Sequence, residues 1–560
     1  MNKAPWLKYY DGIRHNIDYP DITLSEALFE AGEKTPRGKA LIYIGKIFTF
    51  DDVMEGIKRT QSILCKAGVK TGDRIAVCLP NIPQSVFLLY AADRMGAVVS
   101  FLHPLSAPME FARYFQELDA SCVIALDTAY PVIAKAFIKS GERTLILTGG
   151  ADELGTVQRS VYKYKYRKNS RVCSENSKVF LWRSLMKSVS KETPEAAINN
   201  PQDTAVVLFS GGTTGEPKGV MLSAKGLNAM ALQTAEMSHC EIKNKSMLAA
   251  MPMFHGFGLG VCVHTALIHG ASVILVPRFT VCEYAKIIKK YRPNFIAGVP
   301  SLFEALLREP AFDKAELSCL CGVFSGGDAL PLTLKKKFDG FLKAHGAKVK
   351  IREGYGATEC VTASCLTPYN TEREGSIGIP FPDTYYKICK VGTTEEVPTG
   401  EAGEICIHGP ALMKGYLNSP EETEKVLKVH KDSKLWLHTG DVGFIDEDGF
   451  VYFKSRLKRV IVSRGYNIYP QNIEGVLELH PQVEKSCVVG ISDPYKMQRV
   501  KAYVVQRGKA SENALRQELF ELCREHIARF AIPSEIVFIK SLPYTKTGKI
   551  AYTLLEEDWK

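Results

Sequence analysis

The chain has 560 residues, of which 46% are hydrophobic and 24% charged, and its formal net charge is +10. These values exclude an extensively disordered or fibrous chain, and the length exceeds what one hydrophobic core normally organises, so we expect at least two domains. This net positive charge would attract anionic ligands such as nucleotides. It is too small for a chain of this length to indicate binding of nucleic acid.

The cysteines and the N-terminus bear on the compartment. The 15 cysteines show no repeated spacing, and the closest pair, Cys319 and Cys321, lacks the two-residue gap of a metal knuckle or redox pair. We interpret them as small core residues in a reducing cytoplasm. Residues 1–10 contain no apolar core of the signal-peptide type, and no stretch approaches the roughly 18 apolar residues of a membrane helix. We therefore expect neither export nor a membrane span.

The first half of the chain alternates short apolar runs with helix-length segments. Residues 74–79, 122–126 and 144–147 have the composition of buried strands. Residues 85–97 are apolar on most sides and predict a buried helix, whereas 187–202 is a polar, proline-containing connector. This alternation predicts α/β units with largely parallel sheets.

Further along, residues 204–209 and 271–276 are predicted strands, and 281–291 is a predicted helix. Beyond residue 384 the pattern changes to glycine-punctuated, alternating segments such as 403–409 and 449–453, which predict a small β-rich lobe. A boundary near 455–459 then opens a terminal α/β segment of about a hundred residues, which is the size of a domain.

The strongest chemical signal is the glycine-rich segment 209–219, directly after a predicted strand. Its glycines let backbone N–H groups turn toward an anion, and its polar side chains add hydroxyl and ammonium donors. No Gly-Lys-Ser/Thr closes the loop, so it is not a Walker loop. An ordinary glycine turn is the alternative, but such a turn seldom carries so many phosphate donors. The predicted phosphate-binding residues are Ser210, Gly211, Gly212, Thr213, Thr214, Gly215 and Lys218.

This loop resembles the Ser/Thr-Gly-Thr-Thr-Gly-x-Pro-Lys-Gly signature of the adenylate-forming superfamily, which includes acyl-CoA synthetases, luciferases and nonribosomal peptide adenylation domains. Gly211 departs from this signature, because serine is common at that position. We expect the loss of one hydroxyl to weaken phosphate binding without abolishing it. Further motifs of this superfamily follow in its order, so the resemblance runs from about residue 49 to Lys549.

Three of these motifs, at residues 251–256, 325–331 and 354–359, imply contacts with the nucleotide and with the carboxylate substrate. Residues 251–256 resemble the family's Pro-x-Phe-His element, which implies that His255 lies beside the carboxylate to be activated. Residues 325–331 resemble the turn that holds adenine, where glycines allow the backbone to approach the base. The adenine-binding residues implied there are Gly326, Gly327 and Asp328.

The segment 354–359 is similar to the most diagnostic stretch of the family. The resemblance implies that Tyr355, followed by Gly356, stacks on adenine and that Thr358 contacts the α-phosphate. It further implies that Glu359, together with Thr214, holds Mg²⁺, a hard cation that prefers carboxylate and phosphate oxygens.

The remaining motifs lie toward the C-terminus. The carboxylate of Asp441 is suited to accept two hydrogen bonds from ribose hydroxyls. The resemblance implies that Arg456 reaches the ribose and phosphate, that Lys458 is the pivot of a hinge, and that Lys549 is the mobile cation of adenylation. The departures here are Ser455, where the family has Gly or Asp, and Asn472, where it has Glu.

The resemblance implies an α/β fold with a large N-terminal domain of two α/β subdomains plus the β-rich lobe (1–454). A hinge (455–459) and a small mobile α+β C-terminal domain (460–560) would follow. The implied activity is that of an ATP-dependent acid–CoA ligase, which forms an acyl-adenylate and transfers the acyl group to coenzyme A. ATP, Mg²⁺ and coenzyme A are the expected cofactors and cosubstrates.

The class of acid is predicted from the candidate acyl pocket. This pocket is expected near His255 and residues 257–260, 298–300 and 323–324. Small glycines beside apolar residues suit an alkyl chain, so a medium- or long-chain fatty acid is expected first. The alternatives are an aromatic or steroid-like acid, a non-catalytic nucleotide-binding relative and a luciferase-type oxygenase. The expected partners are the carboxylic acid, ATP and coenzyme A, without nucleic acid; peripheral membrane contact and a homodimer are left open.

Overall fold

The structure is a computed structural model with two compact units. The first unit holds the described residues of Met1–Ser210, Pro217–Tyr385 and His408–Leu427, and the second holds those of Tyr386–Ile407 and Lys428–Lys560. Its several sheets with covering helices confirm the predicted α/β fold class. The division at residues 454 and 460 stays a prediction. The described residues are 4–139, 143–165, 178–189, 194–210, 217–463, 466–493, 497–508, 511–528, 531–545 and 549–556.

One sheet of the first unit has eight strands in the order β19-β9-β8-β4-β3-β5-β6-β7. The runs predicted from the sequence at 74–79, 122–126 and 144–147 are its parallel strands β3, β5 and β6. The hairpin β8/β9 and the strand β19 close one edge in antiparallel pairing. The strands are β3 (Arg74–Cys78), β4 (Val98–Phe101), β5 (Cys122–Leu126), β6 (Thr144–Thr148), β7 (Val179–Leu181), β8 (Thr204–Ser210), β9 (Lys218–Ser223) and β19 (Gly415–Tyr416).

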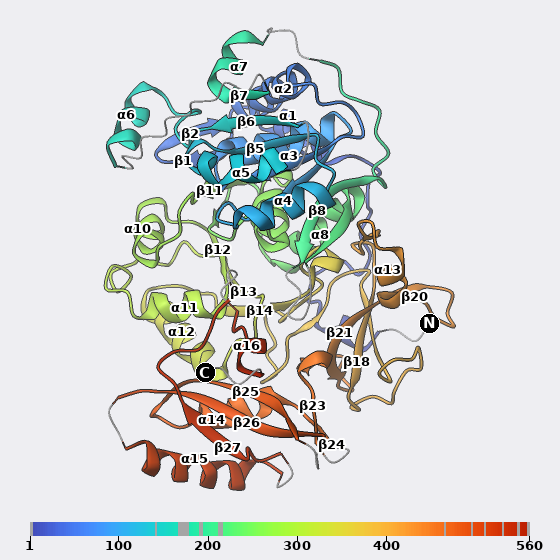
Figure 1. Cartoon of the computed structure of the whole chain (residues 1–560), viewed down its shortest axis with the longest axis vertical. Helices are drawn as coiled ribbons and strands as arrows, with labels where there is room; N and C mark the ends of the chain where they lie inside the picture. Colours follow the sequence, from blue (N-terminus) through green and yellow to red (C-terminus); the bar gives the residue numbers. More distant parts are fainter. Residues whose placement is uncertain are drawn as a thin grey trace. The chain divides into compact units, whose positions relative to one another are not determined.

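Helices α4 (Pro108–Glu117) and α5 (Tyr130–Lys139) pack their apolar side chains on one face of this sheet (Figure 1). The buried helix predicted at 85–97 is α3 (Pro83–Arg94), in which every residue from Pro83 to Asp93 is buried. A helix that is apolar on most sides needs such an interior position. Other helices of this unit are η1 (Pro5–Tyr9), α1 (Leu24–Lys34), α2 (Phe50–Lys66), η2 (Asp127–Ala129), α6 (Thr156–Lys165), α7 (Trp182–Ser188), α8 (Ala224–Met237), α9 (Thr265–Ile268) and α13 (Pro420–Val426).

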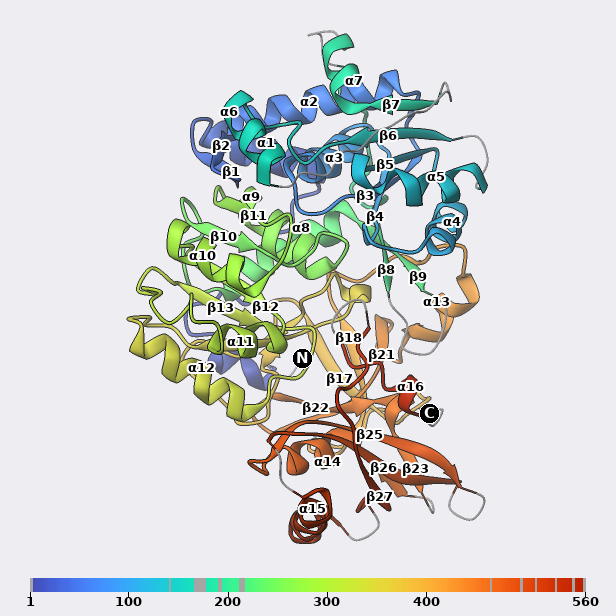
Figure 2. The same cartoon turned by 60° about the vertical axis from the view of Figure 1, so that its left-hand side comes forward.

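The other sheet of the first unit has nine strands in the order β16-β15-β14-β13-β12-β10-β11-β1-β2. Its central strands from β14 to β1 run parallel. Helices α10 (Val281–Tyr291), α11 (Pro300–Leu307) and α12 (Leu332–Ala344) cover one face (Figure 2). The strands are β1 (Lys39–Tyr43), β2 (Lys46–Thr49), β10 (Ser246–Ala249), β11 (Ser272–Leu275), β12 (Phe295–Gly298), β13 (Gly322–Ser325), β14 (Ile351–Tyr355), β15 (Cys365–Leu366) and β16 (Ile379–Pro380).

The β-rich lobe expected beyond residue 384 is a five-stranded sheet in which β17, β18, β21 and β20 follow one another and β22 pairs with β21. Glycines such as Gly403 permit close approach, because a Cβ there would collide with the backbone carbonyl of Cys389. The strands are β17 (Tyr385–Cys389), β18 (Gly403–His408), β20 (Leu427–Val429), β21 (Leu435–Ile445) and β22 (Val451–Arg456).

The C-terminal segment forms a sheet of its own, ordered β24-β23-β26-β25, with β27 parallel to β26. Helices α14 (Pro470–Leu477) and α15 (Glu512–His526) bury apolar side chains on one face, and α16 (Thr553–Glu556) packs on the other. Within the described segments, no helix has the length and apolar character to cross a membrane. The strands are β23 (Ile461–Ser463), β24 (Tyr466–Ile468), β25 (Val483–Asp493), β26 (Met497–Gln506) and β27 (Glu535–Phe538).

Candidate functional site

Several sequence motifs follow the carboxyl ends of neighbouring parallel strands. Strands β14, β13, β12 and β10 lie side by side in the nine-stranded sheet. The segments 251–256, 326–331 and 356–359 come directly after three of them. Because the carboxyl ends of parallel strands meet at one edge, these motifs gather where open α/β sheets usually bind ligands.

Glycines bring the motifs into contact. A Cβ on Gly256 would collide with the side chain of Thr362, and a Cβ on Gly356 would collide with the backbone carbonyl of the same residue. A Cβ on Gly326 would touch the backbone oxygen of Gly354 at 3.4 Å and the ring of Phe257 at 3.7 Å. The segments that carry His255, Gly326 and Glu359 are therefore packed together, and side chains at 256 and 356 would push them apart.

The turn before His255 is held by a buried amide. Asn81 donates from Nδ2 to the backbone oxygens of Ala249 at 3.0 Å and Met251 at 2.8 Å, and its Oδ1 accepts from the Met253 N–H at 3.1 Å. Asn81 is only 3% exposed, so these bonds compete little with water. This role of Asn81 could not be predicted, because an asparagine in a loop has no characteristic spacing.

A π-helix begins directly after His255. The segment η3 (Phe257–His264) has the wide turn of a π-helix, a rare element that is frequent at functional sites. His255 itself is partly buried, with its ring centre 5.1 Å from that of Phe254. Gly258 and Gly260 in η3 are tightly packed: a Cβ would collide with backbone oxygens before His255 or with the Met230 methyl. These glycines therefore serve close packing and do not themselves open space for an acyl chain.

Glu359 is tied to the segment that ends at Tyr416. The Tyr416 hydroxyl donates to Glu359 Oε1 at 2.9 Å, and the Met413 N–H donates to the Glu359 backbone oxygen at 2.8 Å. Burial, reinforced by the negative charge of Glu359, raises the pKa of the Tyr416 phenol well above its usual value. The hydroxyl therefore stays protonated and orients the carboxylate that the sequence assigns to Mg²⁺.

Lys218 meets the same tyrosine from the neighbouring strand. Its Nζ lies 4.9 Å from the centre of the Tyr416 ring and forms an ion pair with Glu422. Lys218 and Lys425 lower the pKa of Glu422 to about 2, so the glutamate is charged at neutral pH. The sequence analysis missed Tyr416 and Glu422, since the pairing of β19 with β9 that places them here is long-range.

The two ends of the glycine-rich segment are fixed by the β8/β9 hairpin. Ser210 and Lys218 are direct partners across the two antiparallel strands, and Ser210 Oγ donates to the Lys218 backbone oxygen at 3.4 Å. The segment thus connects paired strands, as a phosphate loop after a strand requires. Gly211, Gly212, Thr213, Thr214 and Gly215 lie outside the described residues, so their assigned roles remain predictions.

The turn assigned to adenine begins at the end of β13. Gly327 has a φ of +84°, a conformation that favours glycine, and the Gly326 N–H donates to the Gly298 backbone oxygen at 3.1 Å. Asp328 Oδ1 accepts from the following N–H at 2.9 Å. At the far end of the turn, the Leu330 N–H donates to Glu353 Oε1 at 2.9 Å. The turn is thereby anchored to β12 at one end and to β14 at the other.

Burial raises the pKa of Glu353 to about 7, although the Leu330 N–H and Lys335 act in the opposite direction. The folded protein therefore binds this proton more tightly than the unfolded chain does. The contribution is fully present below pH of about 4.5 and is lost as pH rises through about 7. We expect Glu353→Gln, which cannot ionise, to gain about 1–3 kcal/mol in unfolding free energy relative to wild type between pH 5 and pH 8. Urea unfolding at a series of pH values measures this, and parallel curves for the two proteins would contradict the raised pKa.

The backbone after Glu359 is unusual. Tyr355 ends β14, and Thr358 opens the short helix η4 (Thr358–Cys360). The next two residues, Val361 and Thr362, have φ values of +53° and +89°. β-branched residues rarely adopt such angles, and each costs about 1–3 kcal/mol. Strain of this kind persists where the surroundings over-determine the backbone, and here it lies where the motifs pack against Thr362.

The second unit carries the remaining assigned residues. Asp441 in β21 and Arg456 in β22 are direct partners across the sheet, with 3.3 Å between Arg456 Nε and Asp441 Oδ1. Asp441 is 2% exposed, whereas the Arg456 side chain is 46% exposed. Lys458 lies just beyond, in the short helix η5 (Leu457–Arg459). The structure therefore brings Asp441 and Arg456 together as an ion pair.

Lys549 is exposed at the end of a backbone turn. Its N–H donates to Thr545 Oγ1 at 3.1 Å, and the Thr545 N–H donates to the Lys549 backbone oxygen at 2.7 Å. These two bonds tie the backbone of Lys549 to Thr545. An exposed lysine is suited to meet a polyanion.

Two sequence models of known protein families match this chain. The sequence model of the family described as AMP-binding enzyme matches residues 28–417, and that of the AMP-binding enzyme C-terminal domain matches residues 472–549. Together the two matches contain nearly all of the residues discussed above; those between them, such as Asp441 and Arg456, lie in the β-rich lobe and the adjoining segment.

Among curated proteins, the chain is similar to a long-chain-fatty-acid–CoA ligase of Bacillus subtilis, with 34% identity over 100% of this chain and 99% of that protein. It is also similar to a probable 4-coumarate–CoA ligase 3 of Dictyostelium discoideum, with 30% identity over 89% of this chain and 88% of that protein.

Two solved structures share the fold. Against ATP-bound MatB from Rhodopseudomonas palustris the TM-score is 0.82, with 23% identity over 97% of this chain and 99% of the other. Against a benzoate CoA ligase from Burkholderia xenovorans the TM-score is 0.80, with 22% identity over 96% and 100% of the two chains. At these identities the likeness establishes the fold alone.

Proposed function

The chain belongs to the AMP-binding enzyme family, and from this premise we propose that it is an ATP-dependent ligase that activates a long-chain fatty acid as its acyl-adenylate and transfers it to coenzyme A. The observation that carries the proposal is the identity of 34% with a long-chain-fatty-acid–CoA ligase over essentially the full length of both chains. Residues to which the resemblance gives catalytic or binding roles, Lys218, Glu359 and Lys549, are also present in their motifs.

In the first step the substrate carboxylate attacks the α-phosphorus of ATP in line, an acyl-phosphate bond forms and pyrophosphate leaves. Catalysis is positioning plus electrostatic stabilisation, so no covalent enzyme intermediate is needed. His255 orients the carboxylate, Thr358 contacts the α-phosphate, and the glycine-rich segment with Lys218 holds the other phosphates. Lys549 supplies a further positive charge during this step.

The residues around Glu359 fit a Mg²⁺ ion. Tyr416 donates to Oε1, and no described side chain donates to Oε2. Oxygen donors of this kind, completed by phosphate oxygens, are what a hard divalent cation prefers. Glu359 would hold the ion with Thr214, and the ion would offset negative charge on the phosphates. Tyr416 fixes the orientation of the carboxylate in either case.

In the second step the thiol of coenzyme A attacks the acyl carbonyl, the thioester forms and AMP leaves. We place a rotation of the C-terminal segment about Lys458 between the two steps, so that Lys549 acts in adenylation only. Asp441 and Arg456 bind the ribose and phosphate of the nucleotide through both steps. One site thus serves two reactions in sequence.

A small, mostly apolar cavity of about 20 Å³ lies in the first unit, which is room for about one water molecule and not for an alkyl chain. It is lined by residues of α8, η3, β12 and β13, among them Val261, Phe295 and Phe324. Phe324 was expected at the acyl pocket from the sequence, and Val261 follows the 257–260 segment. The preference for an alkyl chain therefore rests on the similarity to a long-chain-fatty-acid–CoA ligase and not on this cavity.

AMP formation from a panel of acids with coenzyme A present tests the proposal. For saturated acids of increasing length we expect kcat/KM to rise by up to about fourfold per CH₂, the equivalent of about 0.8 kcal/mol, until the pocket is full. Higher kcat/KM for benzoate, 4-coumarate or a steroid acid would overturn the fatty-acid assignment. ATP binding without AMP formation from any acid would favour the non-catalytic relative, and light emission or oxygen uptake would favour a luciferase-type reaction.

We propose that the enzyme works in the reducing cytoplasm. The cysteines in the described part of the chain form no disulfide, in agreement with such a compartment. Contact with a membrane surface, the source of long-chain acids, and a homodimer remain compatible with this function.

A further inference from the structure

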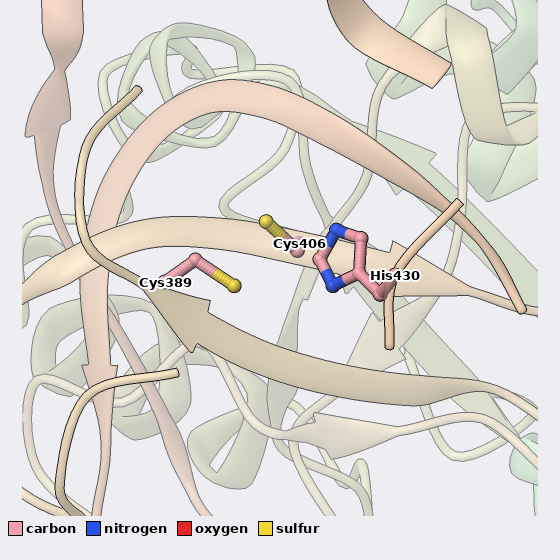
Figure 3. Close-up of side chains that lie close together, drawn as sticks. All are labelled: Cys389, Cys406 and His430. Atoms are coloured by element: carbon pink, nitrogen blue, oxygen red, sulfur yellow. The ribbon is translucent and has the colours of Figure 1, made fainter. Parts of the chain in front are cut away.

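Two cysteines and a histidine, side chains of the kinds that bind metal ions, lie close together in the β-rich lobe and take no part in the reaction described above. Cys389 ends β17, Cys406 lies in β18, and His430 follows β20 (Figure 3). One ligand atom from each lies within 4.8 Å of the other two. Both cysteines are fully buried and His430 is 6% exposed. Solvent therefore reaches none of the three ligand groups freely.

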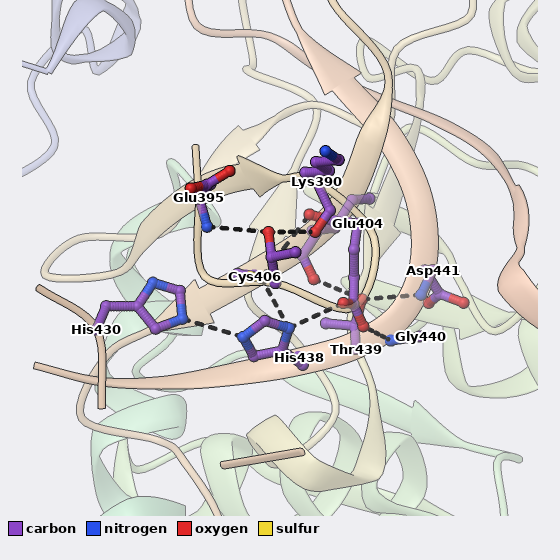
Figure 4. Close-up of polar contacts among 11 residues, drawn as sticks. Lys390, Glu395, Glu404, Cys406, His430, His438, Thr439, Gly440 and Asp441 are labelled. Carbon is purple, nitrogen blue, oxygen red and sulfur yellow. Dashed lines mark hydrogen bonds and ion pairs between the residues drawn. The ribbon is translucent and has the colours of Figure 1, made fainter. Parts of the chain in front are cut away.

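A chain of hydrogen bonds leads from a carboxylate to His430 (Figure 4). Glu404 Oε2 lies 2.8 Å from Nδ1 of His438, and Nε2 of His438 lies 3.0 Å from Nε2 of His430. A carboxylate can only accept, so Nδ1 of His438 carries the proton. In the neutral imidazole its Nε2 then accepts, and the Nε2–H of His430 donates. The lone pair of His430 is thereby directed to Nδ1.

That lone pair is the unsatisfied end of the chain. His430 Nδ1 is buried and has no hydrogen-bond partner among the described residues. A buried acceptor without a hydrogen bond lowers the stability of the folded protein by about 1–3 kcal/mol. In Figure 3 the side chains of Cys389 and His430 face each other, and the side chain of Cys406 lies between them. A cation held by the three groups would satisfy the nitrogen and both sulfurs.

Metal ions bind to cysteine as the thiolate and to histidine as the neutral imidazole. Cys389, Cys406 and His430 bring both kinds of ligand together in one buried group.

We propose that Cys389, Cys406 and His430 bind a zinc ion, at a site separate from that for ATP. Two sulfurs and one imidazole suit a soft or borderline cation and disfavour Mg²⁺ and Ca²⁺. With Zn–S of about 2.3 Å and Zn–N of about 2.0 Å, tetrahedral ligands stand about 3.5–3.8 Å apart, so small side-chain rotations suffice.

Glu404 and His438 support this site and are not its ligands. They engage each other, and Glu404 Oε1 also accepts from the Gly440 N–H at 3.0 Å. A carboxylate that orients a metal-binding histidine through a hydrogen bond is a common support of zinc sites, here extended by one imidazole. The zinc ion would thus link β17 and β18 to His430 and, through His438, to the strand β21 that carries Asp441.

Cobalt substitution of the full-length, reduced protein tests the proposal. We expect the purified protein to hold about one zinc per chain, and Co²⁺ in its place to give the thiolate-to-metal absorption of cysteine ligands. Cys389→Ser and Cys406→Ser should each weaken or abolish this absorption. Cys523→Ser, a change of another buried cysteine in the same unit, should leave it unchanged.

Glu404→Gln guards against misfolding of the cysteine variants, since it keeps all three ligands and an oxygen for the Gly440 N–H. We expect it to lower zinc affinity by about 10–100-fold. Three results would overturn the proposal: no thiolate absorption with Co²⁺ in the folded wild type, undiminished absorption in the Cys389→Ser/Cys406→Ser double variant, or a Cys389–Cys406 disulfide found by mass analysis of the native protein. None of these measurements depends on which acid the enzyme activates.

Discussion

Lys549→Ala is expected to slow pyrophosphate release from acid and ATP by about two to four orders of magnitude, the usual cost of losing one charge-stabilising group from such a site. Thioester formation from supplied acyl-adenylate and coenzyme A should change little, because that reaction develops no charge on a polyphosphate. Pyrophosphate release and thioester formation are measured separately, each under single-turnover conditions.

The control for this variant is Lys540→Ala, which removes another exposed lysine from the same unit. Both half-reactions of the control should run at the wild-type rate. If Lys549→Ala loses the two half-reactions equally, Lys549 is not a cation of adenylation alone, and the assignment is wrong.

Lys458→Pro is expected to leave adenylation measurable and to stop thioester formation. Lys458 lies in the short helix η5, where a fixed φ of about −65° would restrict the backbone rotation between the two steps. The measurement compares AMP-forming turnover with burst formation of acyl-adenylate in the absence of coenzyme A.

Lys458→Ala separates the side chain from the backbone. It removes the same ammonium but leaves the dihedral angles free, so the ratio of thioester formation to adenylation should stay near that of the wild type. If the proline variant catalyses both steps, rotation about this residue is not part of the cycle.

Much of the first unit could be predicted because its signals are local. The strands β3, β5 and β6 and the helix α10 are continuous apolar or periodic segments, and each was found within a residue or two of its bounds. The motifs around His255 and Glu359 were recognisable for a similar reason. Turns that need glycine at fixed positions leave a readable spacing in the sequence.

The residues that were missed depend on long-range pairing. Tyr416 reaches Glu359 because β19 pairs with β9. No residue pattern in the sequence around Tyr416 predicts that contact. The cysteines were interpreted as core residues since no close pair had metal-ligand spacing. Cys389, Cys406 and His430 come together through three strands of one sheet, and such sites have no short sequence signature.

The positive φ angles at Val361 and Thr362 have a consequence for the evolution of this enzyme. Substitutions that relax these two residues would make the protein more robust to heat, yet they would also release the backbone that carries Thr358 and Glu359. Selection for turnover and selection for durability therefore act in opposite directions on this short stretch. Thermal tolerance in relatives of this chain should accumulate elsewhere, in surfaces and loops remote from it.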